Sequence, residues 1–528
     1  MERGSSLRRA PHRIDTLGTA VFWIACAALL VVVGVIAAHV RHGGTPDSLS
    51  NLATARNLAR GEGFTSHIVQ QLSIPEQLPG PEVVRAPGLP CLLGIAFLLF
   101  GPSLAVAAWL NGLIVVATAV ALRRVGLALG GRWVASALGI LVLVDIWNYE
   151  LNSIWNNNLL TLAAVGLLAV AVANARGGLT GFRTPLALAA LSAAGYLVKQ
   201  SFVVSAVPFS LVLLASDPRT ASRAGRIRHA LLYAVLAVAL GSPLWLRNLV
   251  LFADPLYAPA NTLRLVLRHA LLERPEQVVR HLAFGGQTID YRALVARLGL
   301  GEVVRREFHL AAHLARAVFD PRRLVILLWG ACGFALARGA RRRLAALALL
   351  LVLAPLFDCS YMTLEARYLW PIVPVFLFLG LLGTVPDPER ASAPPATGRS
   401  ARAWLVPSLA VAVILGTLAP LIRTHGRDIM TRAALPAPEW AAAVRRLPPG
   451  AMVMTTDPWG VAWYGERLGL IAPCGDRRDL AVVQRHYRPG YLLVLDAESP
   501  FCGWRPEPLR ELDHGRGWAL YRLARPAP

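Results

Sequence analysis

The sequence predicts an α-helical polytopic membrane protein with a small α/β domain near its C-terminal end. Three observations predict this fold class. Hydrophobic residues make up 55% of the 528 residues and charged residues only 16%, whereas soluble chains carry about 25% charge. The mean hydropathy is +0.51. Many apolar runs approach the length of about 20 residues that spans a bilayer. Disorder, coiled coil and collagen are excluded, because none of them tolerates so much unbroken apolar sequence.

The strong positive charge does not indicate a nucleic-acid partner. Lys+Arg total 53 against 31 Asp+Glu, which gives a formal net charge of +22. Lys199 is the only lysine in the sequence, so nearly all of this charge is arginine. Many of the arginines lie in short loops between apolar runs, where they orient helices in a bilayer. The placement of the charges therefore excludes nucleic acid and indicates a membrane.

Eleven apolar runs are predicted to span the membrane. Basic residues precede the first run, which places the N-terminus in the cytoplasm. Because eleven is an odd number of spans, the C-terminal part is expected on the outer side. The membrane is expected to be a bacterial inner (plasma) membrane. The predicted spans are 17–40, 103–122, 134–147, 157–172, 185–198, 202–215, 230–246, 324–337, 344–357, 370–382 and 404–422.

Two outer loops belong to the predicted membrane domain, residues 1–424. The loop 42–88 is polar and helix-like. The apolar piece after it, 89–100, is too short to span and is expected to be re-entrant or interfacial. The loop 252–323 is rich in arginine and histidine and suits amphipathic helices on the membrane surface.

The remaining residues, 425–528, are predicted to form an extracytoplasmic α/β domain. Strand-like runs alternate there with helix-like ones. Two of the six cysteines, Cys474 and Cys502, lie in this domain and could pair in an oxidising compartment; the spacing leaves that open. The strand-like runs are 451–455, 490–495 and 518–523, and the helix-like runs are 438–447 and 478–486.

Asp47 is the main candidate for a catalytic group. It follows the first span in the run G-G-T-P-D-S-L-S-N, where Pro46 suits the start of a helix. The dipole stabilises a carboxylate in the first helical turn, so a simple capping role stays open. Few other acids lie near this outer mouth of the bundle, and ionisable groups placed there are functional candidates by default.

Basic residues gather at the same outer ends of the spans. Fixed cations at that depth suit a lipid phosphate, which is anionic and reaches the site laterally from the bilayer. A lysine there that only extends to the interface is the alternative. The basic residues are Arg85, Lys199, Arg247 and Arg367, and the polar residues beside them or at the start of the fourth span are Gln200, Asn248, Tyr368 and Asn157.

Four ordered motifs resemble those of the GT-C membrane glycosyltransferases. Asp47 followed by A-x-x-L-x-x-G-x-G-F is similar to their first outer loop. The segments R-A-P-G-L-P, P-L-W-L-R-N-L-V-L-F-A-D-P-L-Y and E-A-R-Y-L-W-P-I-V-P are similar to three later motifs. More narrowly, they resemble glycosyltransferase family 39, the protein O-mannosyltransferases and the lipid A aminoarabinose transferases. Many relatives have a second acid beside the first, where this chain has Ser48. Many also have an acid opening the fourth span, where this chain has Asn156 and Asn157.

The resemblance implies transfer of a sugar from a polyprenyl-phosphate donor to an acceptor hydroxyl of a glycan, lipid or protein outside the membrane. It implies that Asp47 is the essential acid and that Arg85 and Arg247 lie near the donor phosphate, with Arg367 close by. Lys199 is added to these phosphate contacts because of its position on the same outer side. Asn157, Gln200, Asn248 and Tyr368 are then the candidate substrate contacts.

A carboxylate that deprotonates the acceptor and cations that stabilise the leaving phosphate suit an inverting displacement. The lipid-linked sugar is a substrate, and no cofactor is expected. With one clear acid there is no obvious ligand set for a metal, so none is expected. Two alternatives stay open: a cell-wall arabinofuranosyl transferase of the same fold and, in a different class, a lipid-linked sugar transporter or flippase. The absence of an internal repeat disfavours the latter.

Overall fold

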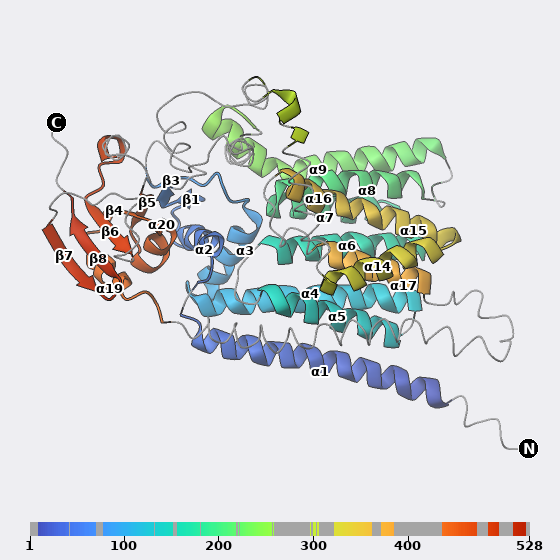
Figure 1. Ribbon diagram of the computed structural model, residues 1–528. Helices are drawn as coiled ribbons and strands as arrows, with labels where there is room; N and C mark the ends of the chain where they lie inside the picture. The colour runs from blue at the N-terminus through green and yellow to red at the C-terminus, as the bar shows by residue number, and fades with distance from the viewer. Residues whose placement is uncertain are drawn as a thin grey trace, which may run out of the picture.

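The structure is a computed structural model (Figure 1), and every structural statement below concerns the residues that it describes. These residues are 9–41, 43–69, 78–130, 132–150, 156–179, 181–217, 220, 222–255, 257, 296, 299–302, 304–305, 321–361, 371–384, 436–472, 484–495 and 510–523.

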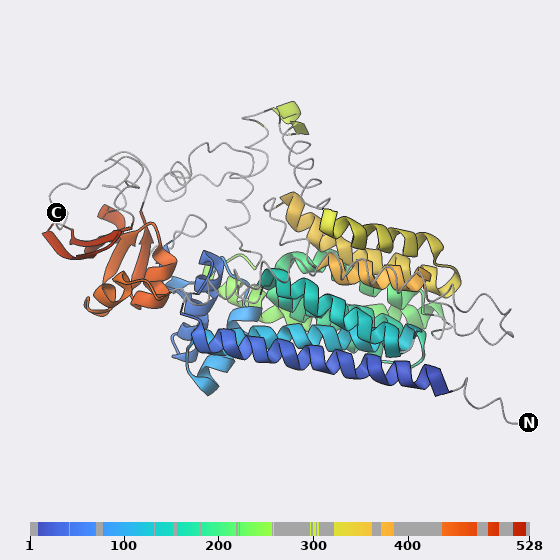
Figure 2. The same cartoon turned by 60° about the horizontal axis from the view of Figure 1, so that its bottom comes forward.

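The larger part of the molecule is a helical bundle. Figures 1 and 2 show α1 along one side of the bundle, starting at the end away from the C-terminal domain. One apolar core runs through the bundle and includes the fully buried Phe22, Leu122 and Phe209. The helices are α1 (Arg9–His39), α4 (Leu104–Gly130), α5 (Arg132–Glu150), α6 (Asn156–Ala175), α7 (Arg183–Val198), α8 (Val203–Ala215), α9 (Arg223–Phe252), α14 (Pro321–Leu336), α15 (Gly339–Leu349), α16 (Leu353–Tyr361) and α17 (Ile372–Thr384).

The outward faces of the long helices are apolar. Ile24 on α1 is 67% exposed and Val250 on α9 is 82% exposed, as lipid-facing side chains are. Among the described residues, 4 helices are long and apolar enough to cross a membrane: Thr16–His39, Leu104–Leu129, Asn156–Ala175 and Arg223–Phe252.

The predicted count of eleven spans is not confirmed. Beyond the four long helices, the described residues contain shorter apolar helices in the regions of most of the other predicted spans. The predicted span 404–422 lies outside the described residues. The short apolar piece that was predicted to be re-entrant or interfacial forms α3 (Gly88–Phe100).

The first outer loop forms α2 (Pro46–Ala59) and three very short strands. Thr45 caps α2, since its side chain accepts the Ser48 N–H at 3.3 Å, and Pro46 occupies the first turn. Although α2 is polar in sequence, its residues from Ser48 to Asn57 are all buried. The helix lies between the bundle and the C-terminal sheet (Figure 1).

The C-terminal domain is built on a six-stranded mixed sheet with the order β2-β5-β4-β6-β8-β7. Its edge strand β2 (Ile68–Val69) comes from the first outer loop and pairs parallel to β5 (Leu468–Ile471). The loop and the C-terminal domain therefore share one sheet. The other strands are β4 (Met452–Thr455), β6 (Tyr491–Leu495), β7 (Arg510–Gly515) and β8 (Trp518–Arg522); the loop also holds β1 (Thr65–Ser66) and β3 (Gly80–Pro81).

Candidate functional site

Asp47 lies in the first turn of α2, at the junction of the bundle and the C-terminal domain. Its side chain is 31% exposed, whereas the ten residues that follow it on the helix are buried. The positive end of the helix dipole favours the ionised carboxylate there. The structure thus presents an accessible anion on a rigid, buried helix.

Arg85 is the direct partner of this carboxylate. Its Nη2 donates to Asp47 Oδ1 at 2.6 Å, and its side chain is only 9% exposed. The two residues are far apart in the sequence, so the fold of the first outer loop brings them together. The Nε–H of Arg85 is buried and has no hydrogen-bond partner among the described residues.

Glu82 organises the turn that presents Arg85. This carboxylate is 1% exposed, and its Oε1 accepts the backbone N–H groups of Val84 at 2.7 Å and of Arg85 at 2.9 Å. Its Oε2 accepts the Thr54 hydroxyl of α2 at 3.3 Å. A buried carboxylate needs such donors, and here they connect the Arg85 turn to the helix that carries Asp47.

Arg247, near the outer end of α9, joins the same assembly. Its Nη2 donates to the Glu82 carbonyl oxygen at 2.7 Å, and its guanidinium lies 5.0 Å from the centre of the Phe64 ring. Cation and ring attract each other in this arrangement. Asp47, Arg85 and Arg247, which were predicted to lie close together, therefore belong to one connected cluster through Glu82.

Lys199 lies at the same end of the bundle but has its own partner. It ends α7, whose last residues pack against Gly88 at the start of α3. Its Nζ is 2.7 Å from Oδ2 of Asp358, a carboxylate on α16 that is 1% exposed. Lys199 thus forms a buried ion pair apart from the pair that Asp47 makes.

The predicted substrate contacts are placed differently from one another. Asn157 is buried in the first turn of α6 and Gln200 begins the short 3-10 turn between α7 and α8. Asn248 is buried, and its amide donates to the Tyr257 carbonyl at 3.2 Å and accepts from Arg247. Asn248 therefore holds the chain that follows α9.

Several predictions lie outside the described residues. Arg367 and Tyr368 do, and so do Cys474 and Cys502. Within the part of the chain that the structure describes, no group of three or more His, Cys, Asp or Glu side chains could hold a metal ion.

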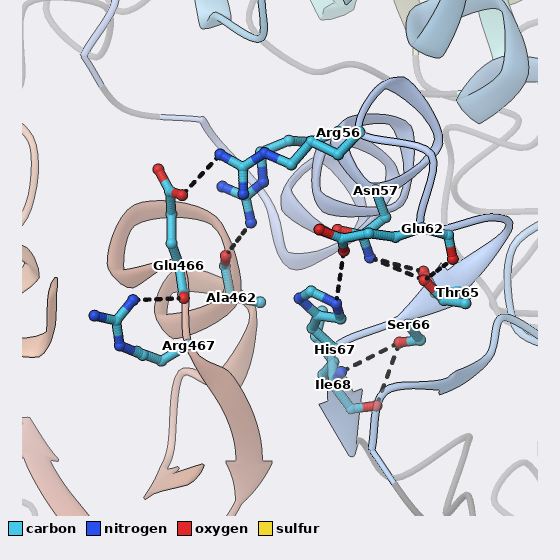
Figure 3. A network of polar contacts seen from close by, with 11 residues as sticks. Arg56, Asn57, Glu62, Thr65, Ser66, His67, Ile68, Ala462, Glu466 and Arg467 are labelled. Carbon is cyan, nitrogen blue, oxygen red and sulfur yellow. Dashed lines mark hydrogen bonds and ion pairs between the residues drawn. The ribbon is translucent and has the colours of Figure 1, made fainter. Parts of the chain in front are cut away.

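Three buried charges near the site were not predicted: Glu82, Arg56 and Asp358. Arg56 of α2 is 3% exposed and donates to the Trp463 carbonyl oxygen at 2.9 Å. It also donates to the Ala462 carbonyl oxygen at 2.6 Å (Figure 3). The sequence signal for Glu82 was an acid three residues before Arg85. The partner residues of Arg56 are distant in sequence, so no local pattern indicates that contact.

The chain is similar to known proteins in its structure and not in its sequence. No protein-family model and no curated protein matches the sequence. Solved structures do match. ArnT from Cupriavidus metallidurans, bound to undecaprenyl phosphate, is 13% identical with a TM-score of 0.54; the match covers 96% of this chain and 98% of that one.

Two further structures extend the likeness. The Archaeoglobus fulgidus oligosaccharyltransferase with a tethered acceptor peptide is 11% identical, with a TM-score of 0.52, over 89% of this chain and 69% of that one. Arabinofuranosyltransferase AftD from Mycobacteria is 15% identical, with a TM-score of 0.54, over 95% of this chain and 41% of that one.

These likenesses show the fold. The protein has the fold of the GT-C membrane glycosyltransferases, and it is a multi-pass membrane protein. The predicted resemblance to that class is confirmed at the level of the fold.

Proposed function

We propose that the protein transfers a sugar, with inversion, from a polyprenyl-phosphate donor to an acceptor hydroxyl at the outer face of a bacterial inner membrane. The observation that carries this proposal is the contact of Asp47 with Arg85 at the start of α2. It combines an accessible carboxylate with a guanidinium whose buried Nε–H has no hydrogen-bond partner among the described residues. The likeness to ArnT, whose structure holds undecaprenyl phosphate, supports the donor class.

Asp47 would act as the general base. An acceptor hydroxyl is a weak nucleophile, so a carboxylate that takes its proton during attack contributes about 10²–10⁴-fold to the rate. The hydroxyl oxygen forms a bond to the anomeric carbon as the bond from that carbon to the phosphate oxygen breaks. Asp47 ends protonated and the electron pair leaves with the lipid phosphate. One displacement inverts the anomeric configuration.

Arg85 and Arg247 would bind the leaving phosphate. Its negative charge grows in the transition state, and fixed cations sheltered from water stabilise it. The buried Nε–H of Arg85 would gain an acceptor from a phosphate oxygen, and a buried donor without a partner is otherwise costly. Lys199 and Arg367 are proposed as further phosphate contacts, with Asn157, Gln200, Asn248 and Tyr368 near the substrates.

The orientation and the sugar complete the proposal. The N-terminus would be cytoplasmic and the C-terminal domain extracytoplasmic. The site would lie at the outer face of the inner membrane. A hexose-like sugar is the first candidate. The likeness to AftD, at a TM-score of 0.54, favours a pentosyl transferase that builds cell-wall polymer as the second.

The experiment uses purified protein, labelled polyprenyl-phosphate hexoses and pentoses, and the variant Asp47→Asn. We expect the wild type to consume one donor class and the variant to lose about 10²–10⁴-fold of that turnover while still binding donor lipid. Asp217→Asn, after α8 at the opposite end of the bundle, is the matched control.

Turnover of Asp47→Asn close to that of the wild type would remove Asp47 as the base. Movement of intact donor lipid between leaflets, without release of its sugar, would indicate a flippase and overturn the proposed function.

A further inference from the structure

The helix that carries Asp47 is held by a π-helical turn of the C-terminal domain. This turn, η4 (Val461–Gly465), continues directly from α20 (Pro458–Gly460). Both elements pack against α2. Trp463 of the turn also stacks on Phe97 of α3, with ring centroids 6.1 Å apart. The helices α2 and α3 therefore both contact the domain at this short segment.

Arg56 makes the central contact (Figure 3). A helix end leaves carbonyl oxygens without partners, and in η4 those of Ala462 and Trp463 accept hydrogen bonds from the two Nη groups of Arg56. The guanidinium also lies 5.1 Å from the centre of the Trp463 ring. Burial lowers the pKa of Arg56 to about 10, so the guanidinium remains charged at neutral pH.

Charge pairs and sheet pairing surround that contact. Arg60, just after α2, lies 2.8 Å from Glu466, which follows η4. Strand β2, a few residues further on, adds to the sheet beside β5. The C-terminal half of α2 and the chain that follows it are thereby fixed to the domain at three successive places: Arg56, Arg60 and β2.

Tyr464 fixes the other end of α2. The backbone N–H of Gly43, four residues before Asp47, donates to the Tyr464 hydroxyl. The hydroxyl is buried, and burial raises the pKa of Tyr464 to about 12, so it stays neutral. A Cβ at position 43 would come 2.4 Å from Leu49 Cδ2 and 3.3 Å from Tyr464 Oη, so the chain passes very close to this side chain.

We infer that the C-terminal domain is part of the catalytic apparatus: η4 sets the position of Asp47 through Arg56 and Tyr464, which act as positioning residues. This inference rests on the proposed function, because it assumes that Asp47 is the base. Their contacts lie on either side of Asp47: Tyr464 binds the backbone at Gly43, before α2, and Arg56 lies in the C-terminal half of α2. Together the two contacts fix the position and the direction of the helix. Neither takes part in a bond-making step.

The test measures kcat, the donor KM and the number of donor-binding sites for Tyr464→Phe, Arg56→Met and Arg56→Lys in the full-length protein. Tyr464→Phe removes one oxygen and keeps the packing. Since a displacement of about 1 Å at a catalytic group costs about 10²-fold, we expect kcat per donor site to fall between about fivefold and 10²-fold while the donor KM changes less than about threefold. The kcat per donor site should fall furthest in Arg56→Met, and Arg56→Lys should recover part of that loss.

A matched control is Arg446→Gln, which breaks the solvent-exposed ion pair with Asp513 of β7 inside the same domain. Its kcat should equal that of the wild type. If Arg56→Met does not fold, Tyr464→Phe alone decides.

If the variants only lose folded protein, the number of donor sites falls while kcat per site stays at the wild-type value, and the inference is overturned. If Asp47→Asn remains active, the assignment of Asp47 as the base has failed instead, and the positioning role fails with it. An inactive Asp47→Asn beside fully active Tyr464→Phe and Arg56→Met refutes only the positioning role.

Discussion

Two ion pairs at the end of the bundle that carries α2 differ in their exposure to solvent. Asp47 and Arg85 are 31% and 9% exposed, and their carboxylate stands at the start of a helix. Asp358 and Lys199 are 1% and 13% exposed, and their carboxylate lies inside α16. Both pairs have an N–O distance below 3 Å. The two ion pairs therefore have similarly short distances between their charges. They differ in the exposure of the carboxylate to solvent.

The difference indicates separate tasks. A general base has to reach the proton that it removes, and the Asp47 carboxylate is the accessible one. A buried ion pair is costly to break because one charge is then left without its partner. We therefore assign the proton transfer to the Asp47 carboxylate. The Asp358 carboxylate is assigned the structural task of pairing with Lys199 at the end of α7.

The largest expected effect is on turnover. Asp47→Asn should reduce turnover by about 10²–10⁴-fold, because it removes the proton acceptor. Asp358→Asn should leave kcat per donor-binding site within about fivefold of the wild type. Assay of both variants with the same labelled donor makes the comparison. Equal losses in the two variants would contradict the division of tasks.

The second effect is on stability. Asp358→Asn leaves the Lys199 ammonium buried without its counter-charge, which should lower the free energy of unfolding by about 3–5 kcal/mol. Thermal unfolding in detergent should show a clear loss of Tm, whereas Asp47→Asn should stay close to the wild type.

A double variant sharpens this result. Lys199→Met combined with Asp358→Leu removes both charges and should recover most of the lost stability, because apolar pairs often replace buried ion pairs without cost. A double variant as unstable as Asp358→Asn would show that the charges themselves are not the cause.

A smaller effect is expected at Glu82, whose carboxylate holds the turn that presents Arg85 to Asp47. Glu82→Gln weakens the charge-assisted bonds that hold the backbone at Arg85. A loss of about 1.4 kcal/mol of transition-state stabilisation corresponds to about tenfold in kcat/KM, which is the expected drop. Glu62→Gln, on the same loop but at an exposed carboxylate, should change kcat/KM little. Equal values for both variants would argue against a role for Glu82.

The smallest effect concerns pH at the β2 edge. Burial lowers the pKa of His67 below its ordinary 6.5, an effect that Arg56 and Arg60 strengthen and Glu62, 3.2 Å away, opposes. The unfolded chain then takes up the proton first. Stability should be full above about pH 6.5 and should fall as the pH drops below that value.

Tm measured between about pH 7 and pH 5 should therefore decline in the wild type and be flatter in His67→Gln. The same slope in both proteins would place the titrating group elsewhere.

The sequence predicts the elements that carry a strong apolar signal. Helices such as α4 and α9 are found because their apolar runs are long, and β4, β6 and β8 fall on predicted runs. Strand β7 reads R-E-L-D-H-G and is exposed, so it has no apolar alternation to detect. Strand β2 has two residues, which no pattern reveals.

The site is predictable only in part, for a similar reason. Asp47 contacts Arg85 directly, and Arg247 joins them through the Glu82 carbonyl. The roles of these residues stay predictions. The Asp358 partner of Lys199 was missed, because α7 and α16 are distant in sequence and meet only in the tertiary structure. A charged residue at the end of an apolar run looks the same whether its partner is a substrate or another side chain.

The most direct test of the account is a structure of the full-length protein with a polyprenyl phosphate bound. We predict a phosphate oxygen within about 3 Å of the Arg85 guanidinium, with the Asp47 carboxylate still on α2 and open to the acceptor side. A phosphate seated on Lys199 and remote from Asp47 would contradict the assignment of the accessible pair to catalysis.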